Sequence, residues 1–437
     1  MHSASRTLAL ATGLALATAL AAPAGAATIT VDTLVFAVLS DGHCSLPEAV
    51  QAANGNAGVD TCAAGAAGTD TIAFSVAGTI FYNHWLDEFA ESAVVEGAGI
   101  VFDGDGQQRL FSVDTSLAGQ KLTINGATIQ NGTSNAIFVG PGETLWLQDS
   151  IVRDNAAGSG AAIYASDPER VRIVRSQLSG NEAYIGGAVY QVGGTLVIED
   201  STLDHNVATF ANGGGQGGAV YLLQGTLDVK RSTFSANTTG GDGGALALYF
   251  NTTGSINSST IASNVADSDG DENGGGGGLW LASGSSVSVK NTVVAANTDG
   301  STGTIEPDFS LQPDGSSVDG TAGFNFVGSN ASVSGPFPLA AQPALPNFNG
   351  NYVGSPAAPL LPLLAPLAAN GGLPTTRMPL RNSPLVDHGA CSGATRDQRG
   401  YGSPTTLLRA YDVATVANGL NTPDACDIGA VEYLAVP

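Results

Sequence analysis

A row of aromatic residues recurs in the middle of the chain at repeat spacing: Tyr164, Tyr190, Tyr221 and Trp280, with Ala247 interrupting it. Exposed rings at a regular spacing could bind sugar rings, because an aromatic side chain combines an apolar body with a polar tip. The same row could be a cross-strand ladder that only stabilises neighbouring strands. It is the candidate ligand-binding site, with the structural ladder as the alternative.

The acidic segment 267–273 contains a second candidate site. Asp267, Asp269 and Asp271 alternate with Ser268 and Gly270, as at the start of a Ca²⁺-binding loop. The bidentate glutamate of a complete loop is missing from the twelfth position. These three aspartates are therefore candidate ligands of a weak calcium site, calcium being the only cofactor that the sequence suggests. A solvated acidic loop is the alternative.

Charged residues of alternating sign form a third row, at Asp149, Arg175, Asp200 and Arg231. A lyase that works by β-elimination needs an unpaired Lys or Arg as base, near carboxylates that hold Ca²⁺. Opposite charges on adjacent strands instead neutralise each other. We expect a structural charge ladder here, and no catalytic residue can be assigned.

A polar turn contains Asp154, Asp204 and His205. Asp154 and His205 would lie two repeats apart in one column, a separation of about 9.6 Å that would suit paired carboxylates in an inverting glycosidase. The repeat between them offers only Ser179 and Gly180 at this turn, and no second pair of acids supports the idea. We interpret the segment as a polar turn.

The elements that position these residues are repeats marked by asparagines 24 to 33 residues apart. They are Asn131, Asn155, Asn181, Asn206, Asn237, Asn264 and Asn297. Six are preceded, five residues earlier, by a serine or threonine: Ser150, Ser176, Ser201, Ser232, Ser259 and Thr292. A repeat of this length predicts a solenoid.

Apolar and polar residues alternate around each repeated Ser or Thr. One apolar column stands two residues after it: Val152, Leu178, Leu203, Phe234, Ile261 and Val294. Alternation with a period of two predicts strands with one face inside, and asparagines at strand ends could hydrogen-bond along the stack. We predict an all-β fold, a single-stranded parallel β-helix with one rung per repeat.

The remaining segments define the expected domain order. Residues 1–26 are typical of a secretory signal peptide, 27–68 of a cap with one short helix, and 69–330 of the β-helix. A Pro- and Ala-rich connection covers 331–375, and a second cap covers 376–437. No other segment is long and apolar enough to span a membrane, so we expect a secreted or cell-surface protein. We also expect the protein to be a monomer.

The charge composition of the chain restricts the partners that the protein can bind. The formal net charge is −23, and removal of the signal peptide, whose one basic residue is Arg6, leaves 14 basic against 38 acidic residues, a charge of −24. A strongly acidic surface disfavours nucleic acids and anionic membranes. Four cysteines allow three pairings. We favour Cys44 with Cys62 and Cys391 with Cys426, because each disulfide would then staple one end.

Several motifs resemble known families. Cys44-Ser45-Leu46-Pro47-Glu48-Ala49 resembles the CSLREA domain of secreted bacterial β-helix proteins, although Pro47 stands where arginine is usual. The stretches 323–328, 383–387, 397–400 and 426–432 are similar to the choice-of-anchor Q end domain, with His388 in place of a small residue. Phe234-Ser235-Ala236-Asn237 and Gly243-Gly244-Ala245-Leu246 resemble repeats of chlamydial polymorphic outer-membrane proteins, which are adhesins.

The resemblances imply a right-handed, pectin-lyase-like β-helix with capped ends. They do not imply one activity. We expect a surface or adhesin-like protein that binds a glycan or another extracellular partner along one face. A polysaccharide lyase or glycoside hydrolase is the first alternative, by analogy with enzymes of this fold, and a purely structural envelope protein is the second. The acidic set Asp387, Asp397, Asp427 and Glu432 is expected to belong to the C-terminal cap.

Overall fold

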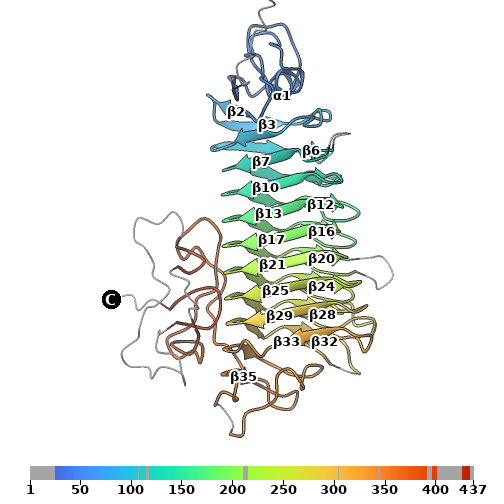
Figure 1. Cartoon of the computed structure of the whole chain (residues 1–437), viewed down its shortest axis with the longest axis vertical. Coiled ribbons are helices and arrows are strands. Elements are labelled where there is room, and N and C mark those ends of the chain that lie inside the picture. Colours follow the sequence, from blue (N-terminus) through green and yellow to red (C-terminus); the bar gives the residue numbers. More distant parts are fainter. Residues whose placement is uncertain are drawn as a thin grey trace, which may run out of the picture.

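The chain winds into a tall parallel β-helix (Figure 1). This computed structural model describes residues 25–106, 108–114, 118–209, 215–303, 305–342, 345–390, 396–400 and 426–433. Residues 1–24 of the expected signal peptide lie outside these ranges. Each full coil passes through four parallel sheets, which we number 1 to 4 in the order in which the chain visits them.

Sheet 1 contains the longest strands, and each pairs in parallel with its equivalent in the next coil. Its strands within the described residues are β1 (Thr28–Val31), β2 (Asp70–Phe74), β4 (Ala93–Glu96), β7 (Lys121–Asn125), β10 (Thr144–Gln148), β13 (Arg170–Val174), β17 (Thr195–Glu199), β21 (Thr226–Lys230), β25 (Thr253–Asn257), β29 (Ser286–Lys290) and β33 (Ser317–Asp319).

Sheet 2 follows after a sharp bend. In the described part of the chain its strands are β3 (Gly78–Phe81), β5 (Ile100–Asp103), β8 (Thr128–Gln130), β11 (Ile151–Arg153), β14 (Gln177–Ser179), β18 (Thr202–Asp204), β22 (Thr233–Ser235), β26 (Thr260–Ala262), β30 (Val293–Ala295), β34 (Phe326–Val327) and β35 (Tyr352–Val353).

Sheets 3 and 4 complete the coil. Sheet 3 consists of β15 (Glu182–Ala183), β19 (Val207–Ala208), β23 (Thr238–Thr239), β27 (Val265–Ala266) and β31 (Thr298–Asp299). Sheet 4 consists of β6 (Phe111–Val113), β9 (Ile137–Val139), β12 (Ile163–Ser166), β16 (Val189–Val192), β20 (Val220–Leu223), β24 (Leu246–Tyr249), β28 (Leu279–Leu281) and β32 (Phe309–Leu311).

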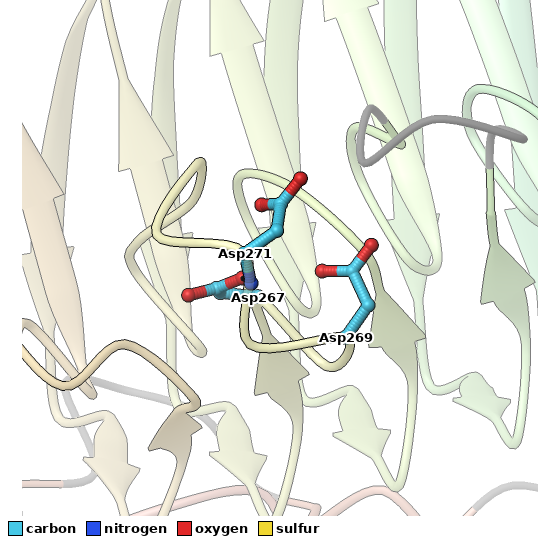
Figure 2. A group of neighbouring side chains, drawn as sticks. All are labelled: Asp267, Asp269 and Asp271. Carbon is cyan, nitrogen blue, oxygen red and sulfur yellow. Dashed lines mark hydrogen bonds between the residues drawn. The ribbon is translucent and has the colours of Figure 1, made fainter.

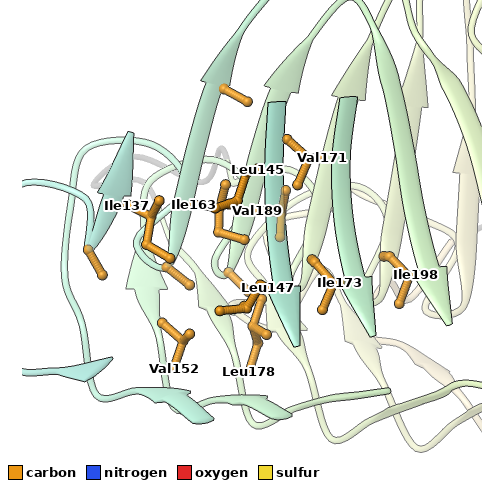
Figure 3. Close-up of a cluster of buried hydrophobic side chains, with 14 of the residues drawn as sticks. Ile137, Leu145, Leu147, Val152, Ile163, Val171, Ile173, Leu178, Val189 and Ile198 are labelled. Carbon is orange, nitrogen blue, oxygen red and sulfur yellow. The ribbon is translucent and has the colours of Figure 1, made fainter. Parts of the chain in front are cut away.

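The core is a column of aliphatic side chains that point inward from sheets 1, 2 and 4 (Figure 3). Successive side chains of a strand alternate between the two faces of a sheet. The column predicted from Val152 to Val294 is confirmed, because its six members are register partners in sheet 2 and have no exposed area.

The bend between sheets 1 and 2 is a single residue in the left-handed region, with φ between 46° and 51° from Asp149 to Asn291. The next residue is the repeated Ser or Thr. Its hydroxyl accepts from the backbone N–H of the equivalent residue one coil earlier, as Ser176 does from Ser150 at 3.1 Å. Asn325 and Asn351 continue this ladder past the last threonine.

The bend between sheets 2 and 3 carries the asparagine ladder. From Asn155 to Asn264, each Nδ2 donates to Oδ1 of the next asparagine at 2.9 Å. The prediction was wrong for Asn131. Gln130 pairs with Arg153, so Asn131 aligns with Asp154, and Gly132 occupies the ladder position. The other end is capped by Asp308, which accepts from Asn297 Nδ2 at 2.8 Å.

The helix α1 (Leu46–Gly55) covers the N-terminal end of the core (Figure 1). Its N-cap is Ser45, and the capping box with Glu48 that the sequence predicted is present. Cys44 and Cys62 form the expected disulfide beside it. The strand β1, within the segment expected to be only a cap, already belongs to sheet 1, because it pairs with β2 across the inserted helix.

The C-terminal segment lies along the side of the solenoid (Figure 1). Its described residues hydrogen-bond to sheet 2 from β14 to β26 and to Asn291 in the bend before β30, including Gln398 with Thr202 and Thr233, and Ala430 with Thr260. These contacts cover a side of the molecule, whereas the sequence suggested a cap over one end. Also, β35 joins sheet 2 within the expected Pro/Ala-rich connection, so the solenoid continues beyond residue 330.

Candidate functional site

The aromatic row stands on sheet 4, as expected from the repeat. Tyr164, Tyr190 and Tyr221 are register partners in β12, β16 and β20. Their ring centroids are 5.3 Å and 5.5 Å apart, and the planes of Tyr190 and Tyr221 differ by 3°. Ala247 occupies the next position, and Tyr249 fills the gap by stacking on Trp280 at 5.8 Å.

The aromatic face is unevenly exposed. Tyr164 and Tyr190 are half-buried, whereas Tyr221 and Trp280 retain only 7% and 6% of their accessible surface. Burial raises the pKa of the Tyr190 hydroxyl, and it raises the pKa of Tyr221 further, with Asp242 among the added negative charges. The accessible part of the predicted row is therefore its N-terminal half.

The row extends further toward the N-terminus than the sequence suggested. Phe138 in β9 is the register partner of Tyr164, with ring centroids 5.5 Å apart. The Arg109 guanidinium lies 4.6 Å from the Phe138 ring and 5.8 Å from the ring of Trp85, which is 62% exposed. Extending the repeat by one coil could have found Phe138. Arg109 and Trp85 come from irregular coils with no sequence periodicity.

The charge ladder is confirmed as a row of neighbouring opposite charges. Arg175 donates to both carboxylate oxygens of Asp149 at 2.7 and 2.6 Å. Arg231 donates to both oxygens of Asp200 and also to Glu199 at 2.6 Å. An arginine held in this way is a poor proton acceptor, so the ladder stabilises the bend between sheets 1 and 2.

The acidic loop brings Asp267, Asp269 and Asp271 together after β27 (Figure 2). One carboxylate oxygen of each lies within 4.8 Å of the others. Asp267 is fully buried and accepts from Ser301 Oγ at 2.8 Å and from the Asp271 backbone at 3.1 Å, while the other two carboxylates are exposed. This set of oxygen donors fits a calcium ion.

Further carboxyl groups surround this side of the solenoid. Asp242 and Glu306 lie near Asp299, which accepts from the Ser301 and Glu306 backbones. Burial, together with the neighbouring charges, raises the pKa of Asp242 to about 7 and also raises the pKa of Glu306. The sequence analysis missed this group because its members come from two coils at irregular spacing.

The acidic set in the C-terminal segment is buried as a unit. Asp387, Asp397, Asp427 and Glu432 are each at most 1% exposed. Arg399, equally buried, donates to Asp397 Oδ2 and to the Glu432 carbonyl. This network holds the segment together. The pairing of Cys426 with Cys391 stays a prediction, since Cys391 lies outside the described residues.

The fold and the comparisons with known proteins define the structural class of this chain. Residues 98–298 match the family described as the right handed beta helix region, and the chain is a right-handed parallel β-helix protein. Neither the curated proteins nor the solved structures contain a significant match that would narrow this class. No described helix is long and apolar enough to cross a membrane. The resemblances to CSLREA, choice-of-anchor Q and chlamydial proteins stay predictions.

Proposed function

We propose that the chain is a secreted, adhesin-like binding protein that holds a glycan along the outer face of sheet 4. The observation that carries this proposal is the continuous aromatic face from Trp85 to Trp280. Its accessible part, from Phe138 to Tyr190, crosses three coils, about 10 Å at the spacing of strands in a sheet. An extended polymer could therefore contact several coils at once.

The stacking defines how a sugar would bind. Neighbouring rings cover each other's faces between Tyr164 and Tyr221, so a ligand there meets ring edges and tyrosine hydroxyls. Trp85 is far more exposed, and its ring is the best platform for a sugar to stack on. We assign Trp85 as the anchor, and Tyr164 and Tyr190 as hydrogen-bonding partners of the next sugars.

Charge favours a neutral glycan. Arg109, a cation on this face, lies near Glu88 and Asp114 and donates to the Ser134 carbonyl. Asp242 lies near the buried end of the face at Tyr221. With a net charge of −23 over the whole chain, an acidic polysaccharide would be repelled.

A glycan array with the protein lacking residues 1–26 tests the proposal. Trp85→Ala should weaken binding at least tenfold, and Tyr164→Phe with Tyr190→Phe should weaken it several-fold without loss of fold. Phe81→Ala, an equally exposed aromatic residue in sheet 2, is the matched control and should bind normally. Unchanged binding by Trp85→Ala, or the absence of any glycan binding, would refute this function and favour a structural envelope role.

A polysaccharide lyase or hydrolase is the second candidate. It is favoured by a surface cavity of about 320 Å³ that contains Asp103, Asp105, Asn131 and Asp154 in its walls. The same array samples, analysed for unsaturated or reducing-end products, distinguish the two functions. Release of product would support the enzyme.

We also propose that Asp267, Asp269 and Asp271 bind calcium. The proposal is supported by their proximity, by the exposure of two of the three carboxylates and by Asp299 nearby, which accepts from the Ser301 N–H while the Ser301 hydroxyl donates to Asp267. Such an ion would fasten the loop after β27 and would play a structural part.

A further inference from the structure

An oriented histidine stands on the turn between sheets 2 and 3. His205 Nδ1 lies 2.8 Å from Asp204 Oδ2. Asp204 is only 4% exposed, and its other oxygen accepts from Gln177 Nε2 at 2.8 Å. The His205 side chain is 63% exposed. A carboxylate that accepts from Nδ1–H holds the ring in one tautomer and leaves Nε2 as a potential ligand atom directed to solvent.

Asp154 occupies the same position two coils earlier. The Asp154 N–H donates to the Ser179 carbonyl, and the Gly180 N–H donates to the Asp204 carbonyl, so Asp154, Gly180 and His205 form one column. All three have φ between 53° and 63°. Asp154 and His205 are therefore separated along the axis by about 9.6 Å.

The Asp154 side chain extends across Gly180 in the direction of the coil that carries His205. A Cβ atom on Gly180 would lie 2.8 Å from Asp154 Oδ1, so this carboxylate already extends over the glycine. Asp204, which His205 Nδ1 contacts, accepts from Gln177 of the coil that contains Gly180. The glycine leaves open the space that a side chain would fill.

We propose that His205 Nε2 and the Asp154 carboxylate bind a divalent transition-metal ion, such as Zn²⁺, above Gly180. Asp204 is the positioning residue. Imidazole with carboxylate is a ligand pair that suits zinc, copper or nickel, whereas calcium prefers oxygen ligands alone. A histidine that ligates a metal commonly donates its other N–H to a carboxylate, as His205 does.

Water would complete the coordination of this ion, which would leave it open to a ligand. The cavity of about 320 Å³ borders the site, since Asp154 forms part of its wall with Asn131 and Asp103. The site is independent of the aromatic face, and it can exist whether or not the chain binds glycans. Asp103 and Asp105 in the cavity wall add negative charge that attracts cations, whereas Arg153 Nη1 lies 3.8 Å from Asp154 Oδ2.

Calorimetric titration of the full chain with ZnCl₂ tests this site. We expect one site in the micromolar range. His205→Asn and Asp154→Asn should each weaken it at least tenfold, and Asp204→Asn should weaken it about 10- to 100-fold. Substitution of Cu²⁺ for Zn²⁺ should give a paramagnetic resonance spectrum with coupling to one nitrogen, which His205→Asn removes.

Two controls make the outcomes decisive. His43→Asn removes another exposed histidine, 3.5 Å from Asp32, and Asp269→Asn alters the acidic loop; both variants should bind zinc normally. Binding that is unaffected by His205→Asn, or that weakens equally in His43→Asn, overturns the proposal, as does the absence of zinc binding below about 1 mM. His205 and Asp154 are exposed, so their variants remain folded even if Asp204→Asn does not.

Discussion

At the residue scale, the fold depends most on one particular side chain at the buried asparagine positions. Asn237 accepts from the backbone and the side chain of Asn206 and donates to the Leu203 carbonyl and to Asn264. Each of these groups is inaccessible to water. A residue of the right shape but without the amide therefore leaves several buried polar groups unpaired.

Asn237→Ala should lower the free energy of unfolding by about 2–5 kcal/mol, because two buried donors of Asn206 lose their acceptor. Urea denaturation measures this difference. Asn273→Ala removes an exposed asparagine outside the ladder and should change stability little. A comparable loss in both variants would mean that the ladder contributes nothing specific.

Asp308 replaces asparagine at the end of this ladder and makes stability depend on pH. It is fully buried, and burial raises its pKa from 3.8 to about 7. A raised pKa in the folded state means that stability is greatest below pH 4 and falls as the pH rises toward 7. Asp242, whose pKa is also raised to about 7, acts in the same direction.

The contribution of Asp308 to the free energy of unfolding should therefore fall between pH 4 and pH 7.5, by up to roughly 4 kcal/mol. Denaturation midpoints over this range measure the fall. Asp308→Asn should make it shallower, because the group no longer titrates. Identical pH profiles for the two proteins would contradict the assignment to Asp308.

At the element scale, the turns carry the charged and polar side chains that distinguish one coil from the next. Each bend between sheets 1 and 2 needs one residue with positive φ, and the chain places charged or polar residues there that pair between coils. The loop after β27 is longer and carries Asp267, Asp269 and Asp271. Loops of this kind can be inserted without disturbing the strands on either side.

Calcium should raise the melting temperature of the protein through this loop. At a free concentration of ~10 times Kd, the gain is about 1.4 kcal/mol. Asp269→Asn combined with Asp271→Asn should abolish the shift, because both exposed ligands are neutralised. Asp319→Asn, at an exposed aspartate in β33, should retain it. A calcium shift that survives the double substitution would place the ion elsewhere.

At the scale of the whole molecule, the C-terminal segment fastens five neighbouring coils from the side. Gln398 is central to this contact, since it accepts from Thr233 Oγ1 at 2.6 Å and donates to the Ser201 carbonyl and to Thr202. Arg377 adds a bond to Ser235 Oγ at 2.6 Å. The contact is largely polar where it meets β18 and β22.

Gln398→Ala should loosen this segment while leaving the solenoid folded. Amide hydrogen exchange should become faster in residues 396–400 and 426–433, because three hydrogen bonds of Gln398 are lost. Sheet 1 serves as the internal control, and its exchange should not change. Equal acceleration in both regions would show that the segment and the solenoid unfold as one unit.

The sequence by itself determined the local and periodic features. Alternation around the repeated serines predicts inward columns such as Val152 and Leu178, and a capping box predicts the start of α1 at Ser45. The stacking of Tyr164 on Tyr190 also follows, because residues at equivalent places in a repeat must become neighbours in parallel strands. Such features depend on residues near in sequence or on strict periodicity.

Only the tertiary structure decided what depends on insertions and on distant segments. The one-residue offset of Asn131 and the position of Trp85 beside Arg109 arise in irregular coils. Tyr221 and Trp280 are buried by packing against neighbours such as Tyr249 and Leu223. The contact of Gln398 with Thr233 joins residues far apart in the chain. Periodicity carries no information about such contacts, because each forms once and is selected by packing of the completed solenoid.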